Sequence, residues 1–442
     1  MVLRLTRPLL LLFFTGLFFR TEAQPDTLLA DTALLKKVEI ERLKYKQQPG
    51  LALAASKIFF SDKRYSISGF GEFNFVPYQE GVNRDVGDLE LYYSGLYRFA
   101  TFFGYRFSDK FIWNSEFQIE LLHDRDQEVH YEIVIEAFVD YIAADYLKAR
   151  LGFYPLTIGY VNNNDEPVQF YSVNRAEVER IITPSTWIEF GMMFYGNISP
   201  SFSYALGFSQ GLNSVTYLGP TWIRQGREIR IDVPERISVN PQLNYTGIKN
   251  LTLSASGYFG DSGQGNSVLT DAGEERVDAT IALGTAYAKY DYKNWRFISV
   301  GTYGSLSDTD KIFQLTEREQ GIGQVLGSEV YGYLFELGHD ILPYLRRGSN
   351  PKHDEHPLYN RAEMKFSLFG RYERLNTHNR IDDALRFEDV AVSDLDIWTF
   401  GVNFNTRENI VLKANYQYRV NRYSGDPNPF KNIVEAGIGF IF

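Results

Sequence analysis

Strict alternation of apolar and polar residues is the dominant pattern of the chain from about residue 66 onward. In the stretch 111–121, Phe111 and Phe117 share one face, whereas Glu116 and Glu120 share the other. A period of two is typical of β-strands with one apolar and one polar face. The pattern predicts about sixteen strands, at 66–75, 89–107, 111–122, 131–144, 147–160, 186–195, 201–210, 235–246, 251–260, 277–291, 295–306, 329–341, 362–374, 397–405, 410–421 and 433–442.

The connections between these segments alternate between short and long. The short ones are 108–110, 145–146, 196–200, 247–250, 292–294 and 406–409. The long ones are 76–88, 123–130, 161–185, 211–234, 261–276, 307–328, 375–396 and 422–432. Short periplasmic turns, long extracellular loops and an even strand number are typical of bacterial outer-membrane barrels. We therefore predict an all-β fold, a transmembrane antiparallel β-barrel of about 16 strands.

One connection departs from this alternation, and the two ends of the barrel bear on its orientation. The connection 342–361 is long although it occupies a short-turn position, which suggests a periplasmic excursion. An even number of strands returns the chain to its starting rim, so both barrel termini are expected on the periplasmic side. The last strand ends in Phe442 and resembles the recognition signal read by the outer-membrane assembly machinery.

The N-terminal region predicts export. Arg4 and Arg7 precede an apolar core at 9–19 that is short for a membrane span, and this pattern predicts a signal peptide, residues 1–23. An uncleaved anchor is the alternative. Residues 24–57 are predicted to be a periplasmic N-terminal extension with a short helix, or a small oligomerisation coil, and residues 58–442 to form the barrel.

Composition excludes several other classes of protein. The 442 residues include no Cys, 16% are aromatic, and the mean hydropathy is −0.26. A disordered chain would be poor in aromatic residues, and a disulfide scaffold would be rich in Cys. A barrel wall that meets lipid only at every second residue explains many aromatic residues in a chain of negative mean hydropathy. The net charge of −10, or −12 without residues 1–23, disfavours nucleic acid as a partner.

Candidate catalytic and metal-binding motifs are weak. Gly260-Asp261-Ser262-Gly263 looks like the nucleophile context of a serine protease, but it lies among small turn residues. His353-Asp354-Glu355-His356 is bracketed by prolines and fits a solvated loop better than a metal site. No persuasive Ser and His pair for a membrane lipase is evident. We assign no catalytic residue, no metal ligand and no cofactor, and expect a protein that is not an enzyme.

Several stretches, taken in order, resemble a known family. They are DLELYYSGLYRFATFFGYRFSDKFIWNSEFQIEL (88–121), NDEPVQFYSVNRAEVERIITPSTWIEFG (164–191), FELGHDILPYL (335–345), FGRYERLNTH (369–378) and WTFGVNFNTRENIVLKANYQYRV (398–420). Together they resemble the phosphate-selective porin family, the porins of O and P type, of Gram-negative bacteria. The resemblance implies a trimeric 16-stranded channel in outer-membrane lipid, with a third loop folded into the pore and Arg and Lys side chains guiding anions. The arginine ladder of the family has no clear counterpart in this chain.

The candidate pore-lining residues lie on the polar faces of the predicted strands, opposite the apolar faces, or in the third long loop. The cations are Arg98, Lys148, Arg150, Arg175, Arg180, Arg371, Lys413 and Arg419. The acids are Glu116, Glu120, Glu132 and Glu136. Arg150 and Arg175 are expected near the narrowest part, and their replacement by Ala is expected to lower the anion-to-cation permeability ratio. The alternative is that these charges pair across strands and only hydrate the lumen.

The sequence thus predicts an outer-membrane porin that allows passive diffusion of small hydrophilic solutes, with anions such as phosphate as candidates. The alternative is a structural or ligand-binding outer-membrane barrel with a closed lumen. The long connection 161–185 motivates that alternative. The net acidic charge leaves the preference between anions and cations open.

Overall fold

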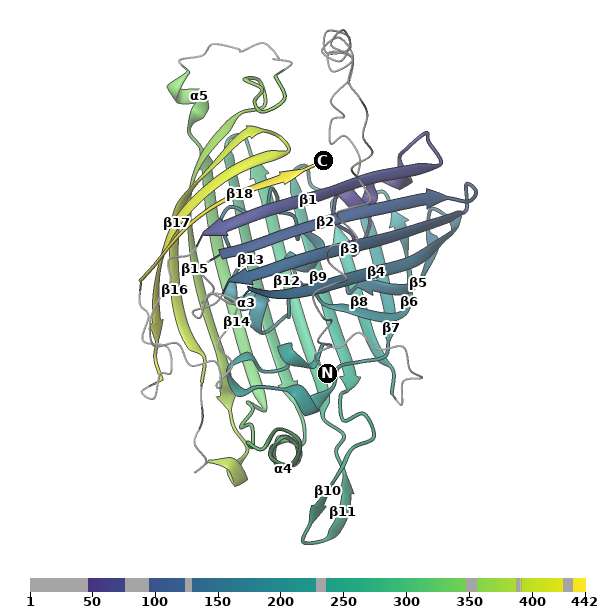
Figure 1. The fold of residues 1–442 in the computed structure, drawn as a ribbon, viewed down its shortest axis with the longest axis vertical. Coiled ribbons are helices and arrows are strands. Elements are labelled where there is room, and N and C mark those ends of the chain that lie inside the picture. The colour runs from purple at the N-terminus through teal and green to yellow at the C-terminus, as the bar shows by residue number, and fades with distance from the viewer. Residues whose placement is uncertain are drawn as a thin grey trace, which may run out of the picture. The chain divides into compact units, whose positions relative to one another are not determined.

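A closed barrel of sixteen antiparallel strands forms the protein in the computed structural model (Figure 1). The structure describes residues 47–75, 95–123, 129–227, 236–346, 356–386, 390, 392–423 and 432–442. The barrel strands are β1 (Tyr65–Phe75), β2 (Gly95–Arg106), β3 (Phe111–His123), β4 (Val129–Ala144), β5 (Leu147–Pro155), β6 (Ile188–Ser199), β7 (Phe202–Ser209), β8 (Ser238–Tyr245), β9 (Leu251–Asp261), β12 (Thr280–Tyr292), β13 (Trp295–Leu306), β14 (Glu329–Asp340), β15 (Lys365–Arg380), β16 (Asp394–Arg407), β17 (Ile410–Asn421) and β18 (Asn432–Ile441). The predicted fold class is confirmed.

Elements outside the wall are short. The hairpin β10 (Ser267–Thr270) and β11 (Gly273–Arg276) and the helix α4 (Thr309–Gln320) lie in long connections, and α5 (Leu342–Leu345) follows β14. Inside the barrel lie the 3-10 helices η1 (Ala54–Phe59) and η4 (Val161–Asn163) and the helix α3 (Glu177–Ile181). None of the helices in the described ranges is long and apolar enough to cross a bilayer.

Alternation along the strands produces the two faces of the wall. In β17, Lys413 and Asn415 are buried towards the lumen, whereas Leu412 and Tyr416 are exposed on the outer face. Successive side chains of a strand lie on opposite faces. A sequence in which apolar and polar residues alternate therefore places its apolar side chains on one face and its polar side chains on the other. The outer face of the wall is therefore apolar and aromatic, and the lumen is polar.

The structure corrects the predicted end of one strand and the predicted extent of one loop. The predicted strand 147–160 ends at Pro155, because the chain leaves the wall there and carries apolar residues into the lumen. The predicted loop 375–396 is shorter than expected, because β15 continues to Arg380 and β16 begins at Asp394. Of the predicted strand 89–107, the part before Gly95 lies outside the described residues.

The barrel closes where β1 pairs with β18, with Phe70 opposite Ile441. The Gly69 amide donates to the carbonyl oxygen of Phe442, and the Phe442 amide donates back to Gly69. A Cβ at Gly69 would lie 2.5 Å from the Phe442 ring, so only glycine leaves room for the last side chain there. Both ends of the wall lie at the rim that carries the short turns.

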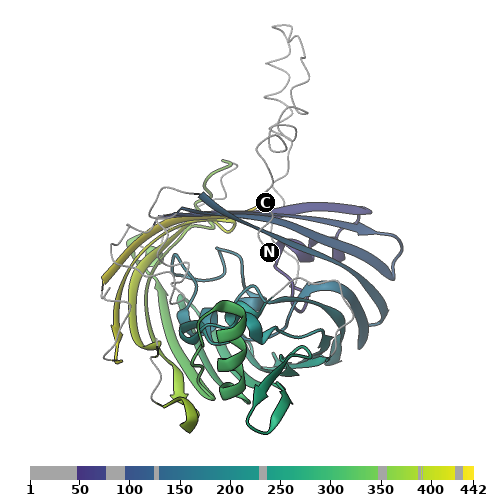
Figure 2. The same cartoon turned by 60° about the horizontal axis from the view of Figure 1, so that its bottom comes forward.

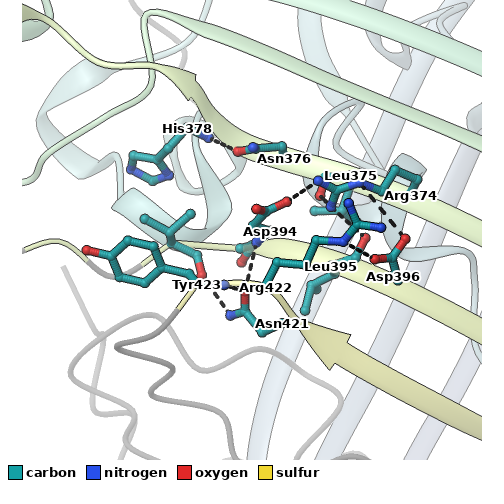
Figure 3. A network of polar contacts seen from close by, with 12 residues as sticks. Arg374, Leu375, Asn376, His378, Asp394, Leu395, Asp396, Asn421, Arg422 and Tyr423 are labelled. Atoms are coloured by element: carbon teal, nitrogen blue, oxygen red, sulfur yellow. Dashed lines mark hydrogen bonds and ion pairs between the residues drawn. The ribbon is translucent and has the colours of Figure 1, made fainter.

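A set of paired charges lies near the long-loop ends of β15, β16 and β17 (Figure 3). Arg374 forms an ion pair with Asp394, and Arg422 forms one with Asp396. Below them, the Tyr372 hydroxyl donates to Asp396 at 2.6 Å, and the Tyr372 ring packs against Trp398. Charges above an aromatic belt are typical of the level at which a barrel leaves the hydrocarbon region.

Candidate functional site

The connection between β5 and β6 folds into the lumen instead of extending outward. We call residues 156–187 the inner segment. Its two ends are joined, because the Leu156 amide donates to the Trp187 carbonyl oxygen at 2.8 Å. Between them the segment is largely buried, and the side chains of Ile158, Val178 and Ile182 are at most 1% exposed. Figure 2 shows segments and helices enclosed by the ring of strands.

The inner segment is fixed to the far wall by hydrogen bonds to β15 and β17. The Arg371 guanidinium donates to the Ser172 hydroxyl at 2.6 Å, and the Lys413 ammonium donates to the Ser172 carbonyl oxygen at 2.9 Å. The Val173 amide donates to Asn415 at 2.7 Å. Strand residues from the last third of the chain therefore hold the segment in place.

Salt bridges fix the same segment to the near wall. Arg98 on β2 lies 2.8 Å from Asp165 of the inner segment and 2.9 Å from Glu72 on β1. Arg175 also forms an ion pair with Asp165, so two cations share one carboxylate. Both Arg98 and Glu72 are almost completely buried. These charges balance one another, as buried charges must.

The part of the N-terminal extension that the structure describes lies inside the barrel. We call residues 47–59 the N-terminal segment. Asn114 on β3 donates to the Ala55 carbonyl oxygen at 2.8 Å, and Ser68 on β1 donates to Ala54 at 2.7 Å. Residues 47–57 of the predicted extension therefore contact the inner face of β1 and β3, and the division between extension and barrel at residue 57 stays a prediction. Residues 1–46, with the predicted signal peptide and most of the predicted helix or coil, lie outside the described residues.

Two buried carboxylates of the inner segment accept hydrogen bonds from backbone amides. Glu166 accepts hydrogen bonds from the amides of Leu53 and Ala54 at 2.9 and 2.6 Å. Glu179 accepts one from the amide of Val161 at 3.0 Å. Burial raises the pKa of Glu166 to about 7 and the pKa of Glu179 to about 7, although the amide donors oppose the rise.

The candidate cations of the strand walls are paired with nearby groups. Arg150 is completely buried, lies 3.0 Å from Asp140 and donates to the Pro49 carbonyl oxygen. Arg180 and Arg419 both pair with Glu177, at 2.5 and 3.6 Å. The structure thus brings Arg98 with Arg175, Arg371 with Lys413, and Arg180 with Arg419, while Arg150 and Lys148 lie apart from these three groups.

The candidate acids and Lys148 occupy the β3–β5 side of the wall. Glu116 lies opposite Glu136, and Glu120 opposite Glu132, in the register of β3 and β4. The side chain of Glu132 lies outside the described part of the structure. Lys148 lies 3.4 Å from Asp145 at the short-turn rim. The register therefore pairs these four candidate positions across β3 and β4, and their place in the pore lining stays a prediction.

A polar cavity opens at the short-turn rim beneath the inner segment. We call it the vestibule, and its volume is about 890 Å³. Its lining includes Lys148, Gln242, Asn244, Lys289 and, from the inner segment, Tyr160. Sequence reasoning missed Gln242, Asn244 and Lys289, although their alternate positions in two predicted strands could have marked them as lumen-facing.

The weak motifs have structural roles where the structure describes them. Ser262 is completely buried and donates to the Ala279 carbonyl oxygen at 2.7 Å, so its hydroxyl stabilises a turn. Of the predicted loop 353–356, only His356 is described, and its ring stacks on Tyr359. Among the described residues, no group of three or more His, Cys, Asp or Glu side chains could hold a metal ion.

These features define the chain as a closed sixteen-stranded barrel with a segment folded into its polar lumen. No family model matches the chain. An uncharacterized protein of Aquifex aeolicus is 26% identical over 379 residues, covering 84% of this chain and 79% of that protein.

Two solved structures are similar to this chain. The outer membrane channel DcaP of Acinetobacter baumannii has a TM-score of 0.50 and 12% identity, covering 86% of this chain and 97% of that one. An anion-selective porin from Comamonas acidovorans has a TM-score of 0.46 and 10% identity, covering 86% and 99%. At 12% identity, the likeness to DcaP shows that the two chains share a fold.

The raised pKa values of the inner carboxyl groups predict a pH-dependent stability. With a pKa of about 7, Glu179 is protonated in the folded protein at a pH where the unfolded chain, with an ordinary glutamate pKa, has lost the proton. The free energy of unfolding should therefore fall as the pH rises from about 4.5 to about 7. The variant Glu179→Gln keeps an acceptor oxygen and should be about 2–3 kcal/mol more stable than the wild type at pH 8, and equal to it at pH 4.

The loss of heat-modifiable electrophoretic mobility, followed against temperature at pH 4 and pH 8, measures this difference. Glu319→Gln on the exposed side of α4 is the matched control and should show no such difference. A wild type and Glu179→Gln variant that differ equally at both pH values would contradict the prediction.

Proposed function

We propose that this protein is an outer-membrane channel through which small hydrophilic solutes diffuse passively. The observation that carries the proposal is the inner segment, which crosses a closed polar barrel and narrows it above an open vestibule. A barrel with an apolar outer face and a polar interior suits a membrane that separates two aqueous compartments. We infer that the short-turn rim faces the periplasm and that the outer face meets outer-membrane lipid.

The charges around the vestibule support a preference for anions. Lys148 and Lys289 line it together with Asp145, so cations exceed acids at this mouth. Fields are focused in a narrow passage with low-dielectric walls, so a local excess can outweigh the acidic charge of the whole chain. Phosphate is one candidate solute. A trimeric assembly, which the family resemblance implies, is part of the same proposal.

Reconstitution into planar bilayers tests the channel directly. The purified, folded protein should produce discrete conductance steps, and a salt gradient should give a reversal potential of the sign expected for a moderate anion preference. Protein denatured before reconstitution is the control. A folded protein that produces no conductance steps in repeated trials would contradict the channel, and a cation-selective reversal potential would contradict the anion preference.

A barrel with a closed lumen is the second candidate. The burial of the inner segment and of the N-terminal segment favours it, because both fill the lumen beside β1, β2 and β3. In that case the vestibule would be a binding cavity that does not continue to the other rim. The conductance measurement separates the two candidates.

A further inference from the structure

The vestibule wall presents polar side chains in an ordered grid. In the strand register, Asn244 on β8, Ser254 on β9 and Tyr287 on β12 form one row. Lys289, opposite Thr252, lies in the next lumen-facing row towards the short-turn rim. Neighbouring strands are about 4.8 Å apart, so a row of three spans about 10 Å. This wall is wide enough for an organic solute and not only for a single ion.

Two amide side chains in this wall have hydrogen-bonding atoms without partners. Asn244 donates to Gln242 Oε1 at 3.2 Å, which satisfies one atom of each amide. Gln242 Nε2 and Asn244 Oδ1 are buried and have no hydrogen-bond partner among the described residues. A buried polar atom without a partner is unfavourable, because it has lost its hydrogen bonds to water. One donor and one acceptor side by side match a hydroxyl group, which can accept from the first and donate to the second.

A lysine supplies one positive charge beside these amides. Lys289 lines the vestibule and has neither an ion pair nor a hydrogen bond within the part of the chain that the structure describes. The other lysine of the cavity, Lys148, pairs with Asp145 at 3.4 Å. One ammonium group therefore remains available to an anionic ligand.

Two aromatic rings contribute to the lining of the cavity. Tyr160 of the inner segment meets Tyr287 edge to face, with ring centroids 5.3 Å apart. Both tyrosines line the vestibule. Pockets for small molecules combine apolar or aromatic surface with a few polar groups that fix orientation, and this one adds a cation.

We propose that the vestibule binds a hydroxylated monocarboxylate, such as a sugar acid. Its carboxylate pairs with Lys289, its hydroxyls bond to Gln242 and Asn244, and its carbon skeleton lies against Tyr287. This inference rests on the proposed function, since it names the solute class that would pass through the vestibule. A phosphate dianion fits less well, because a wall of neutral amides with one available ammonium group offers too little positive charge for it.

Calorimetric titration of the purified full chain in detergent tests this site without requiring conductance. The probes are glucuronate, glucose and inorganic phosphate. Glucuronate should bind at least about tenfold more tightly than either of the other two, a difference of about 1.4 kcal/mol. Absence of glucuronate binding, or equal affinity for phosphate and glucuronate, would overturn the proposal.

Single substitutions test which side chain binds the carboxylate of the ligand and which binds its hydroxyl groups. Lys289→Gln should weaken glucuronate binding about tenfold and leave glucose affinity within about twofold. Gln242→Leu should weaken the binding of both. Lys249→Gln, on the exposed short turn between β8 and β9, removes the same charge outside the cavity and should change neither. Equal losses in Lys289→Gln and Lys249→Gln would show that only the overall charge matters and would overturn the site.

The binding measurement tests the proposed site and the conductance measurement tests the proposed channel, so either proposal can be refuted without the other. Glucuronate binding by a protein that shows no conductance supports the site and refutes the channel, which leaves the closed barrel. Conductance without glucuronate binding supports the channel and refutes the site.

Discussion

Replacing residues 157–186 by an Asn-Gly turn should raise the single-channel conductance severalfold. The inner segment crosses the lumen and contacts both walls, so its removal leaves the wide interior of a sixteen-stranded barrel. The design is feasible because Leu156 and Trp187 are already joined by a hydrogen bond at the ends of β5 and β6. A two-residue turn of this type connects neighbouring antiparallel strands. Planar-bilayer recordings of wild type and variant measure the change.

The outer hairpin provides a matched control for this deletion. Residues 267–276 form the β10–β11 hairpin, and their ends are also joined, since the Val277 amide donates to Asn266 at 2.9 Å. The same Asn-Gly turn in place of 267–276 should leave the conductance unchanged. Heat-modifiable mobility confirms that each variant folds. Equal conductance of the folded 157–186 variant and the wild type would show that the inner segment does not limit passage.

Replacing Arg150 by Ala should lower the free energy of unfolding by about 3–5 kcal/mol, because it leaves a buried carboxylate without its cation. Asp140 and Arg150 are both completely buried, and the Tyr195 hydroxyl donates to the same carboxylate at 2.8 Å. Unfolding in urea at a fixed detergent concentration measures the loss. The sequence-based expectation for Arg150 concerned ion selectivity, whereas its burial predicts an effect on stability.

Lys148→Ala is the control for this prediction. Lys148 lies two residues away on the same strand and face, but its partner Asp145 is largely exposed, and exposed pairs contribute at most about 1 kcal/mol. The double variant Asp140→Asn with Arg150→Met should recover most of the stability, because it removes both charges and keeps an acceptor for Tyr195. Similar losses in Arg150→Ala and Lys148→Ala would contradict the assigned role of the buried pair.

Much of the wall could be predicted from the sequence, whereas the interior could not. Strands such as β3 and β13 were located to within one residue, because their alternation is a local property of the chain. The end of β5 was missed, since the apolar residues after Pro155 continue the strand pattern but are buried inside the lumen. Local sequence does not distinguish burial in lipid from burial in a folded lumen.

The candidate site could also be predicted only in part. The alternation of side chains along the strands predicted that Arg98, Arg371 and Lys413 face the lumen. Their partners, Asp165 and Ser172, come from a segment whose course no local pattern specifies. The vestibule was missed for a related reason, because Gln242 and Lys289 are ordinary polar positions until the register of β8, β9 and β12 brings them to one cavity.

The sequence by itself determined that this protein is an antiparallel barrel with short turns at one rim and long connections at the other. Side-chain alternation is fixed by strand geometry, and each residue needs only its neighbours in sequence to define its face. The tertiary structure decided which lumen charges are paired and which remain available. Ion pairing and hydrogen bonding depend on separations of a few ångströms between groups such as the Arg371 guanidinium and the Ser172 hydroxyl, which lie 199 residues apart in the chain, and only the folded path of the inner segment sets those separations.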